Sequence, residues 1–193
     1  TLKGAEGDLK KMIEKKGEVG MMSFPVWYVA LEAPNYPKAA FPEGIPVWFH
    51  VDGFSGDIHE MNTINHYVGM YPLEDGAKIE RALGPFLMLG ISLLMILFIC
   101  IRKKWSWIFM LPSALFPLGF FAFYSGWMYW FGHNMQEWGA FKIKAFMPTA
   151  LGVGHVAHFT TKSFPSIGFW ILVIIAVLSV LALLARRNEL KKQ

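Results

Sequence analysis

The sequence predicts a membrane protein of α+β class, with three transmembrane helices and a small β-rich domain on the exported side. The 193-residue chain is 54% hydrophobic, which is more apolar than is usual for a soluble domain. Three apolar runs, at about 83–101, 107–131 and 167–185, each approach the roughly 20 residues that a helix needs to cross a bilayer. The first half of the chain is polar and has β character, which predicts a domain outside the membrane.

Basic residues beside the apolar runs predict the orientation, because Lys and Arg at span ends stay in the cytoplasm. Residues 102–104 (RKK) separate the first two runs, and Arg186, Arg187, Lys191 and Lys192 follow the third. We therefore expect a multi-pass protein of the bacterial inner membrane with a cytoplasmic tail at 186–193. Residues 1–82 and the loop 132–166 are expected on the exported side. An exported start requires a signal peptide or an upstream anchor before Thr1.

The segments before the first run differ in character. Residues 1–20 form either a charged lead-in or a short amphipathic helix, and residues 21–82 form the β-rich domain. Residues 21–31 (MMSFPVWYVAL) are too short to span a bilayer, and Val47, Phe49 and Val51 alternate with Trp48, His50 and Asp52. About 60 residues make only a small core, so this antiparallel sheet is expected to pack against the loop 132–166 or against a partner.

The second apolar run contains Pro112 and Pro117, which predict a kinked helix. Aromatic residues crowd its outer end and are typical of a belt at the membrane surface. They are Phe120, Phe121, Phe123, Tyr124, Trp127, Tyr129, Trp130 and Phe131.

All six histidines fall outside the apolar runs, and the predicted topology places all of them on the exported side. None lies in mid-membrane, which argues against a haem held between two spans. The single cysteine, Cys100, is not in a C-x-x-C-H motif, so covalent haem is excluded. The basic residues are not interleaved with aromatics, which argues against nucleic acid as a partner.

The densest group of possible ligands is HEMNTINHYVGM at 59–70. A helix that begins at Asn62 and ends at Gly69 would place His66 and Met70 on one face, with His59 and Met61 just before it. Imidazole and thioether together suit a soft metal, especially Cu(I). The same residues also fit a polar turn held by side-chain to backbone hydrogen bonds.

Two further segments could contribute ligands. GHNMQEW at 132–138 places His133 and Met135 just beyond the second run, and GHVAH at 154–158 would bring His155 and His158 together on one helical turn. For these last two histidines and for His50, hydrogen bonding to the protein itself is the more common role.

Sequence motifs of the common enzyme classes are absent. There is no G-x-S-x-G, no G-x-x-x-x-G-K and no H-E-x-x-H, although Asp52, Asp57 and Glu60 lie close together in the sequence. We therefore expect no catalysis by this chain alone, while an enzyme that uses a metal on the exported histidines remains an open alternative.

The segments 59–70 and 141–168 resemble uncharacterised bacterial membrane proteins of the gene clusters for maturation of nitrous oxide reductase, a copper respiratory enzyme. The shared pattern is E-x-N-x-x-N-H-Y-x-G-M before three spans, which marks Glu60, Asn62, Asn65, His66, Tyr67, Gly69 and Met70 here. The resemblance implies a copper-linked accessory role in the exported compartment.

Two functions are compatible with these observations. The first is a membrane accessory protein that handles copper, or docks onto a copper or haem respiratory assembly, through its exported His/Met face. The second is a structural subunit of a larger membrane complex, of respiratory or metallo-oxygenase type, with no metal of its own. Lipid and other membrane or exported subunits are the expected partners in both.

Overall fold

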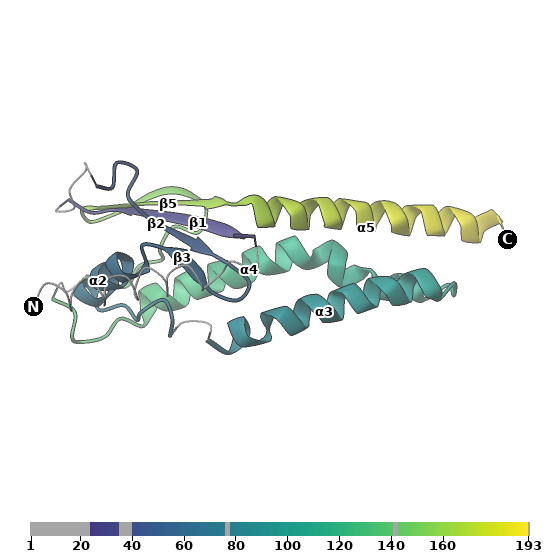
Figure 1. The fold of residues 1–193 in the computed structure, drawn as a ribbon, viewed down its shortest axis with the longest axis horizontal. Helices are drawn as coiled ribbons and strands as arrows, with labels where there is room; N and C mark the ends of the chain where they lie inside the picture. The colour runs from purple at the N-terminus through teal and green to yellow at the C-terminus, as the bar shows by residue number, and fades with distance from the viewer. Residues whose placement is uncertain (1–23, 35–39, 76–77, 141–142, 193) are drawn as a thin grey trace, which may run out of the picture.

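The fold is α+β, with a five-stranded sheet at one end and three long apolar helices at the other (Figure 1). The computed structural model describes residues 24–34, 40–75, 78–140 and 143–192, so the expectation for residues 1–20 lies outside the described residues. The elements are β1 (Trp27–Glu32), β2 (Ile45–Phe49), β3 (Phe54–Gly56), α2 (Ile58–Val68), α3 (Lys78–Cys100), the 3₁₀ turn η1 (Ser106–Phe109), α4 (Leu111–His133), β4 (Gly152–Val156), β5 (Phe159–Pro165) and α5 (Ile167–Lys192).

The sheet is antiparallel, in the order β3-β2-β1-β5-β4. Its central strand, β1, pairs Trp27 with Phe49 of β2 on one side and with Pro165 of β5 on the other. The alternation predicted for β2 is confirmed, because Val47 is buried and Phe49 packs against the core. Trp48 contacts Tyr28, its partner in β1, at 5.3 Å between ring centroids. Strands β4 and β5 come from the loop 132–166, for which the sequence predicted no strands.

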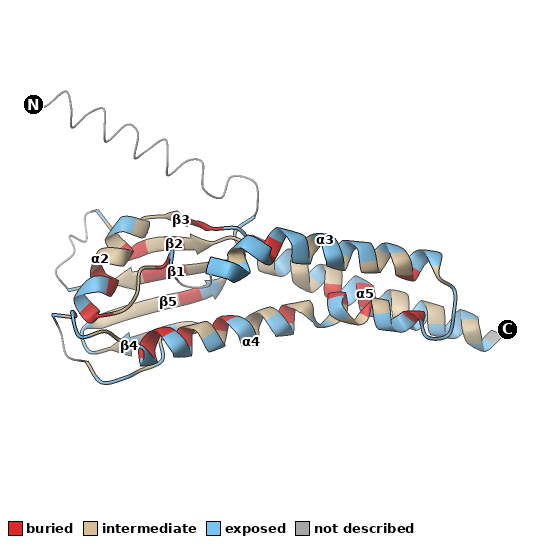
Figure 2. Ribbon diagram, turned by 90° about the horizontal axis from the view of Figure 1, so that it is seen from below, coloured by how far each residue is buried: buried red, intermediate tan, exposed pale blue. Residues whose placement is uncertain are grey.

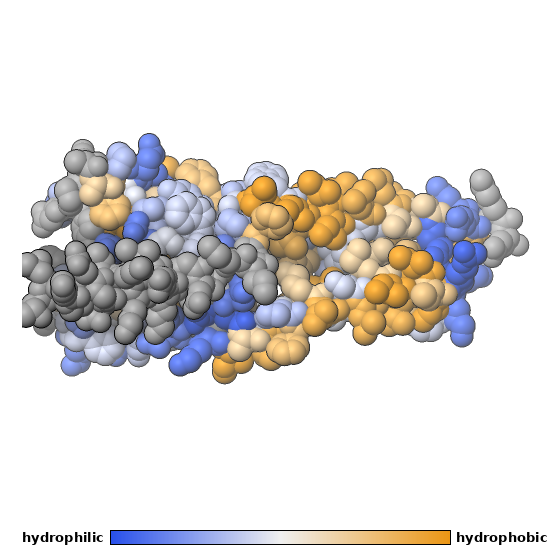
Figure 3. All heavy atoms as spheres, in the orientation of Figure 1, coloured by the Kyte–Doolittle hydropathy of each residue, from blue (hydrophilic) through white to orange (hydrophobic). Residues whose placement is uncertain are grey.

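Three helices are long and apolar enough to cross a membrane, which makes this a candidate multi-pass membrane protein. They begin and end close to the predicted runs, except that α3 begins five residues earlier and α5 continues to Lys192. Figure 3 shows a hydrophobic band over the helices between two hydrophilic ends. The basic residues 102–104, 186–187 and 191 belong to the end away from the sheet.

The aromatic residues of α4 have a different role from the predicted surface belt. The last part of α4 lies under the sheet (Figures 1 and 2), and there Tyr124, Met128 and Phe131 belong to the hydrophobic core. The ring of Trp27 contacts Tyr124 at 5.0 Å. Only part of the set, including Tyr129, is exposed as a belt would be.

The prolines of α4 differ in their position within the helix. Pro112 lies in the first turn, where its missing N–H removes no helical hydrogen bond. Pro117 lies inside the helix and is buried. Only this second proline therefore removes a hydrogen bond of the kind that the predicted kink requires.

The three helices pack unevenly. A hydrogen bond between the hydroxyls of Ser113 and Ser179 (2.9 Å) joins α4 to α5. Arg186 of α5 donates to the carbonyl oxygens of Phe98 and Ile101, both at 3.1 Å, and so caps the end of α3. Within α3 itself only Gly84 and Phe98 are buried, so most of its apolar surface contacts no other part of the described chain.

Candidate functional site

Helix α2 carries the group of ligands that the sequence singled out, but it begins earlier than predicted. Its first residue is Ile58, so Asn62 is not its N-cap. Asn62 instead joins α2 to the segment that follows, because its Nδ2 donates to Glu74 Oε2 (2.6 Å) and its Oδ1 accepts from the backbone N–H of Leu73 (2.9 Å). This is the polar, hydrogen-bonded role that the sequence left open as the alternative to a metal ligand.

The end of α2 is as predicted. Gly69 adopts a left-handed conformation (φ 84°) and its N–H donates to the carbonyl of His66 (3.0 Å). The next N–H, of Met70, donates to the carbonyl of Asn65 (2.7 Å). This hydrogen-bonding pattern satisfies the last carbonyls of the helix and turns the chain sharply at Met70.

The imidazoles and thioethers of this motif lie on different sides of the structure. Met61 is only 6% exposed and faces the core, and Met70 is half-buried against it. His59 and His66, seven positions apart, are both exposed on the outer side of α2. The single His/Met face that the sequence predicted is therefore divided into an outer imidazole surface and an inner thioether surface.

Residues 136–139, which follow α4, pack against the end of α2. The N–H of Gln136 donates to the carbonyl of Gly69 (2.7 Å), and the ring of His66 stacks on Trp138 with centroids 6.2 Å apart. A Cβ on Gly69 would lie 2.6 Å from the carbonyl oxygen of Gln136, and one on Gly139 would lie 2.8 Å from the nitrogen of Gly69. We call this contact, between residues 66–70 and 136–139, the clasp.

The clasp brings together two segments that the sequence treated as separate candidates, 59–70 and 132–138. It lies at the sheet end of the molecule, away from the C-terminus of α5 (Figures 1 and 2). Gln136 and Trp138 carried no signal of this role in the sequence, because a backbone hydrogen bond and a ring contact leave no motif.

His133 is exposed and held in one orientation at the end of α4. Its Nδ1 lies 2.8 Å from the carbonyl oxygen of Tyr129, and its ring stacks on the Tyr129 ring at 3.8 Å. A carbonyl oxygen only accepts, so Nδ1 is the protonated nitrogen in this hydrogen bond, and Nε2 is the nitrogen left to bind a ligand. Histidines that bind metals are commonly held by such a bond from the other ring nitrogen. Met135, two residues later, is half-buried against the core.

The remaining histidines have local partners or lie in a turn. His50 Nε2 forms a hydrogen bond with Ser55 Oγ (2.7 Å), and His155 Nδ1 forms one with Thr160 Oγ1 (3.0 Å). The prediction that His155 and His158 share a helical turn is wrong, because His155 lies in strand β4 and His158 in the turn to β5. Strands β4 and β5 form a hairpin in which Val156 pairs with Phe159, so residues 154–158 do not have the helical conformation that an i, i+3 contact requires.

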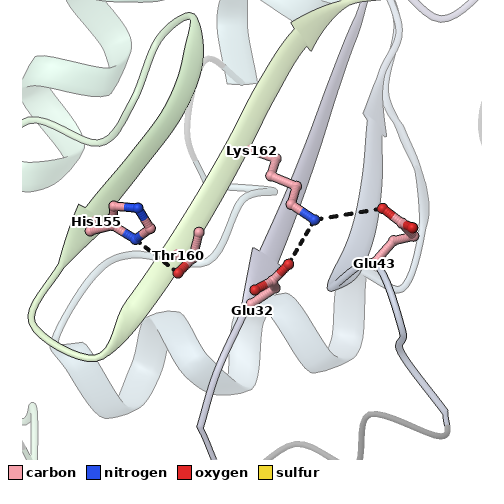
Figure 4. A network of polar contacts seen from close by, with 5 residues as sticks. All are labelled: Glu32, Glu43, His155, Thr160 and Lys162. Atoms are coloured by element: carbon pink, nitrogen blue, oxygen red, sulfur yellow. Dashed lines mark hydrogen bonds and ion pairs between the residues drawn. The ribbon is translucent and has the colours of Figure 1, made fainter.

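The face of the sheet near His155 also carries an ion pair. Lys162 Nζ lies 2.7 Å from Glu32 Oε1 and 3.5 Å from Glu43 Oε2 (Figure 4). The hydrogen bond to Glu32 raises the pKa of Lys162 above its ordinary value. One ammonium group therefore faces two carboxylates at this place on the sheet.

No group of three or more His, Cys, Asp or Glu side chains that could hold a metal is found in residues 24–34, 40–75, 78–140 and 143–192. Cys100 is exposed at the end of α3, away from the sheet.

A partly open cavity of about 90 Å³ lies between the sheet, α2 and α4. Met61 and Met70 line it, together with Met128 of α4 and the buried Asn65. Met128 was not among the residues that the sequence singled out, because it lies within an apolar run where methionine is ordinary packing material.

No protein-family model matches this chain, and neither a curated protein nor a solved structure is found to match it.

Proposed function

We propose that this chain is an accessory protein of the bacterial inner membrane that handles copper on the exported side, with the clasp and the adjoining His133 as its working surface. The orientation rests on charge. The basic residues of 102–104, with Arg186, Arg187 and Lys191, gather at the end of the three helices away from the sheet, and such residues are retained in the cytoplasm.

His133 is the observation that carries the copper proposal. It is exposed, its Nδ1 proton is committed to the Tyr129 carbonyl, and its free Nε2 is a ready ligand for Cu(I). His59 and His66 add two exposed imidazoles on the neighbouring helix. Separate, solvent-exposed imidazoles favour binding that is quickly exchanged, which suits delivery of a metal better than permanent storage.

Copper binding tests the proposal. The full chain, purified in mild detergent, is titrated with Cu(I) buffered by a chromogenic chelator, and the double variant His66→Ala/His133→Ala is compared with His155→Ala/His158→Ala. We expect the first pair to weaken Cu(I) binding and the second pair to leave it unchanged. Absence of Cu(I) binding by the native chain, or equal binding by both variants, would remove the proposal.

The orientation needs its own measurement. Native Cys100 reports on the end of the helices away from the sheet, and Val153→Cys in a Cys100→Ser background reports on the exposed strand β4. A membrane-impermeant maleimide added to intact spheroplasts is expected to label only the second protein. Labelling of Cys100 alone would reverse the proposed topology.

A structural role in a larger membrane complex is the second candidate, and helix α3 favours it. Only two of its 23 residues are buried, and its outward apolar side chains include Phe86, Leu89 and Leu93. Neighbouring helices of another subunit would cover this surface as readily as lipid does. Recovery of a stable multi-subunit particle that carries no copper on this chain would favour this role over metal handling.

A further inference from the structure

The cavity between the sheet, α2 and α4 is unusual in the chemistry of its walls. Three thioethers line it, from Met61 of α2, Met70 beyond its end, and Met128 of α4. Met61 and Met128 are 6% and 8% exposed, so neither thioether is on the outer surface. The remaining walls are largely aliphatic and aromatic side chains, with Thr149 and Thr161 as small polar groups and no ionisable side chain.

Asn65 adds a polar side chain to the wall of the cavity. The residue is 8% exposed and lies one helical turn after Met61, which places both on the same face of α2. Its backbone carbonyl accepts from Met70, but none of the described residues forms a hydrogen bond with its side-chain amide.

The size and chemistry of the cavity limit what can occupy it. A volume of about 90 Å³ is smaller than the roughly 150 Å³ cavity that admits benzene, so a quinone ring or a lipid chain does not fit. Thioether sulfur and a neutral amide oxygen are poor ligands for Mg²⁺, Ca²⁺ or Zn²⁺, which prefer carboxylate, imidazole or thiolate. Thioether groups select Cu(I), a soft monovalent ion.

We infer that Met61, Met70 and Met128 form an internal Cu(I) site, with the Asn65 carboxamide beside it. This inference rests on the proposed function and deepens it, because it adds a buried thioether site behind the exposed imidazoles. Met70 lies between the two, since it is half-buried and is the last residue of the first segment of the clasp. Copper would be received at the surface histidines and held in its reduced state by the thioethers.

Methionine-to-leucine substitutions test the site because leucine keeps the volume and the apolar character of the side chain. The full chain and the variants Met61→Leu and Met128→Leu are titrated with buffered Cu(I) in detergent. Met147→Leu is the matched control, since Met147 is 45% exposed and does not line the cavity. We expect each cavity variant to bind Cu(I) about tenfold more weakly or worse, since even indirect partners of a metal are worth about that factor.

X-ray absorption spectroscopy of the Cu(I)-loaded protein gives a readout that a packing defect would not imitate. We expect sulfur neighbours of copper in the native chain and in Met147→Leu, and fewer of them in Met61→Leu and Met128→Leu. Unchanged thermal unfolding of the apo variants shows that the fold is kept.

The outcomes separate this site from the outer histidines. Weaker binding in the methionine variants, with loss of sulfur neighbours, supports the internal site whether or not His66→Ala/His133→Ala has an effect. Weaker binding in the histidine variant alone, with only nitrogen or oxygen around copper, overturns the internal site and keeps the proposed function. Absence of Cu(I) binding by the native chain overturns both.

Discussion

The indole N–H of Trp27 donates to the hydroxyl of Ser163 (2.8 Å), and both residues are fully buried. The same hydroxyl donates to the carbonyl of Ala150 (2.9 Å) and lies 3.3 Å from the hydroxyl of Tyr124. One serine thus joins the central strand β1, the strand β5 that leads into α5, and helix α4. The contact between the sheet and the helices depends on this small polar group.

Ser163→Ala is expected to lower the free energy of unfolding by about 1–3 kcal/mol, because the Trp27 N–H and the Ala150 carbonyl lose their buried partner. The measurement is thermal or denaturant unfolding in one detergent. Ser92→Ala is the control, since Ser92 is exposed and bonds only within its own helix. A Ser163→Ala protein as stable as the control would show that the network is not needed.

Gly69→Ala is expected to open the clasp. Its left-handed conformation alone costs an alanine about 1–2 kcal/mol, and the new Cβ would lie 2.6 Å from the carbonyl oxygen of Gln136. Limited proteolysis with mass spectrometry should then detect faster cleavage in residues 134–140.

Gly90→Ala is the matched control for the clasp, because a Cβ at Gly90 meets nothing within 4 Å. The same substitution in a helix with open space is expected to be neutral or slightly stabilising. Equal cleavage rates in the two variants would contradict the close approach at Gly69.

Arg186→Gln is expected to loosen α3 from α5, because the two hydrogen bonds to the carbonyls of Phe98 and Ile101 are lost. A charged donor makes each of these bonds stronger than a neutral one, and we expect a loss of about 2 kcal/mol in unfolding free energy. Arg187→Gln removes the same charge from an exposed position and is expected to change little. An equal loss of stability in both variants would show that the positive charge stabilises the protein and that the two hydrogen bonds from Arg186 to α3 do not.

The ion pair of Lys162 predicts a loss of stability in alkaline solution. Its pKa is raised above 10.5 by the hydrogen bond to Glu32, so its contribution to stability is complete below 10.5 and is lost as pH rises through the folded-state pKa. Glu32→Gln should therefore lower stability at neutral pH, and the difference from wild type should shrink in strongly alkaline buffer. Glu43→Gln, whose partner is 3.5 Å away, is expected to have the smaller effect.

Local patterns predicted the parts of the fold that depend on local physics. Runs of apolar residues identified the three long helices, alternation identified β2, and Gly69 identified the end of α2. Local patterns failed where distant parts meet. Strand β5 pairs with β1, which lies more than a hundred residues earlier in the chain, and β4 pairs with β5. Asn62 forms hydrogen bonds with Leu73 and Glu74, which no capping rule includes.

In the candidate site too, the sequence predicted the local features but not those that depend on contacts between distant segments. The ligand types in 59–70 were visible in the sequence, but their separation into an outer imidazole surface and an inner thioether surface depends on which face of α2 meets the sheet. Met128 joined the cavity through tertiary packing alone. Met61 lies five positions before His66, and Met70 lies beyond the left-handed residue Gly69, so neither thioether shares the helix face of the exposed imidazoles.

The junction of β5 with α5 sets the order in which the molecule can be assembled. Only Ser166 separates strand from helix, and its N–H donates to the carbonyl of Val26 (3.0 Å), which extends the pairing up to the helix. Strand β1 is therefore made early in synthesis but receives its second neighbour only when the last long helix follows. Until then one edge of β1 has no strand beside it. This free edge can pair with the wrong strand or bind a chaperone.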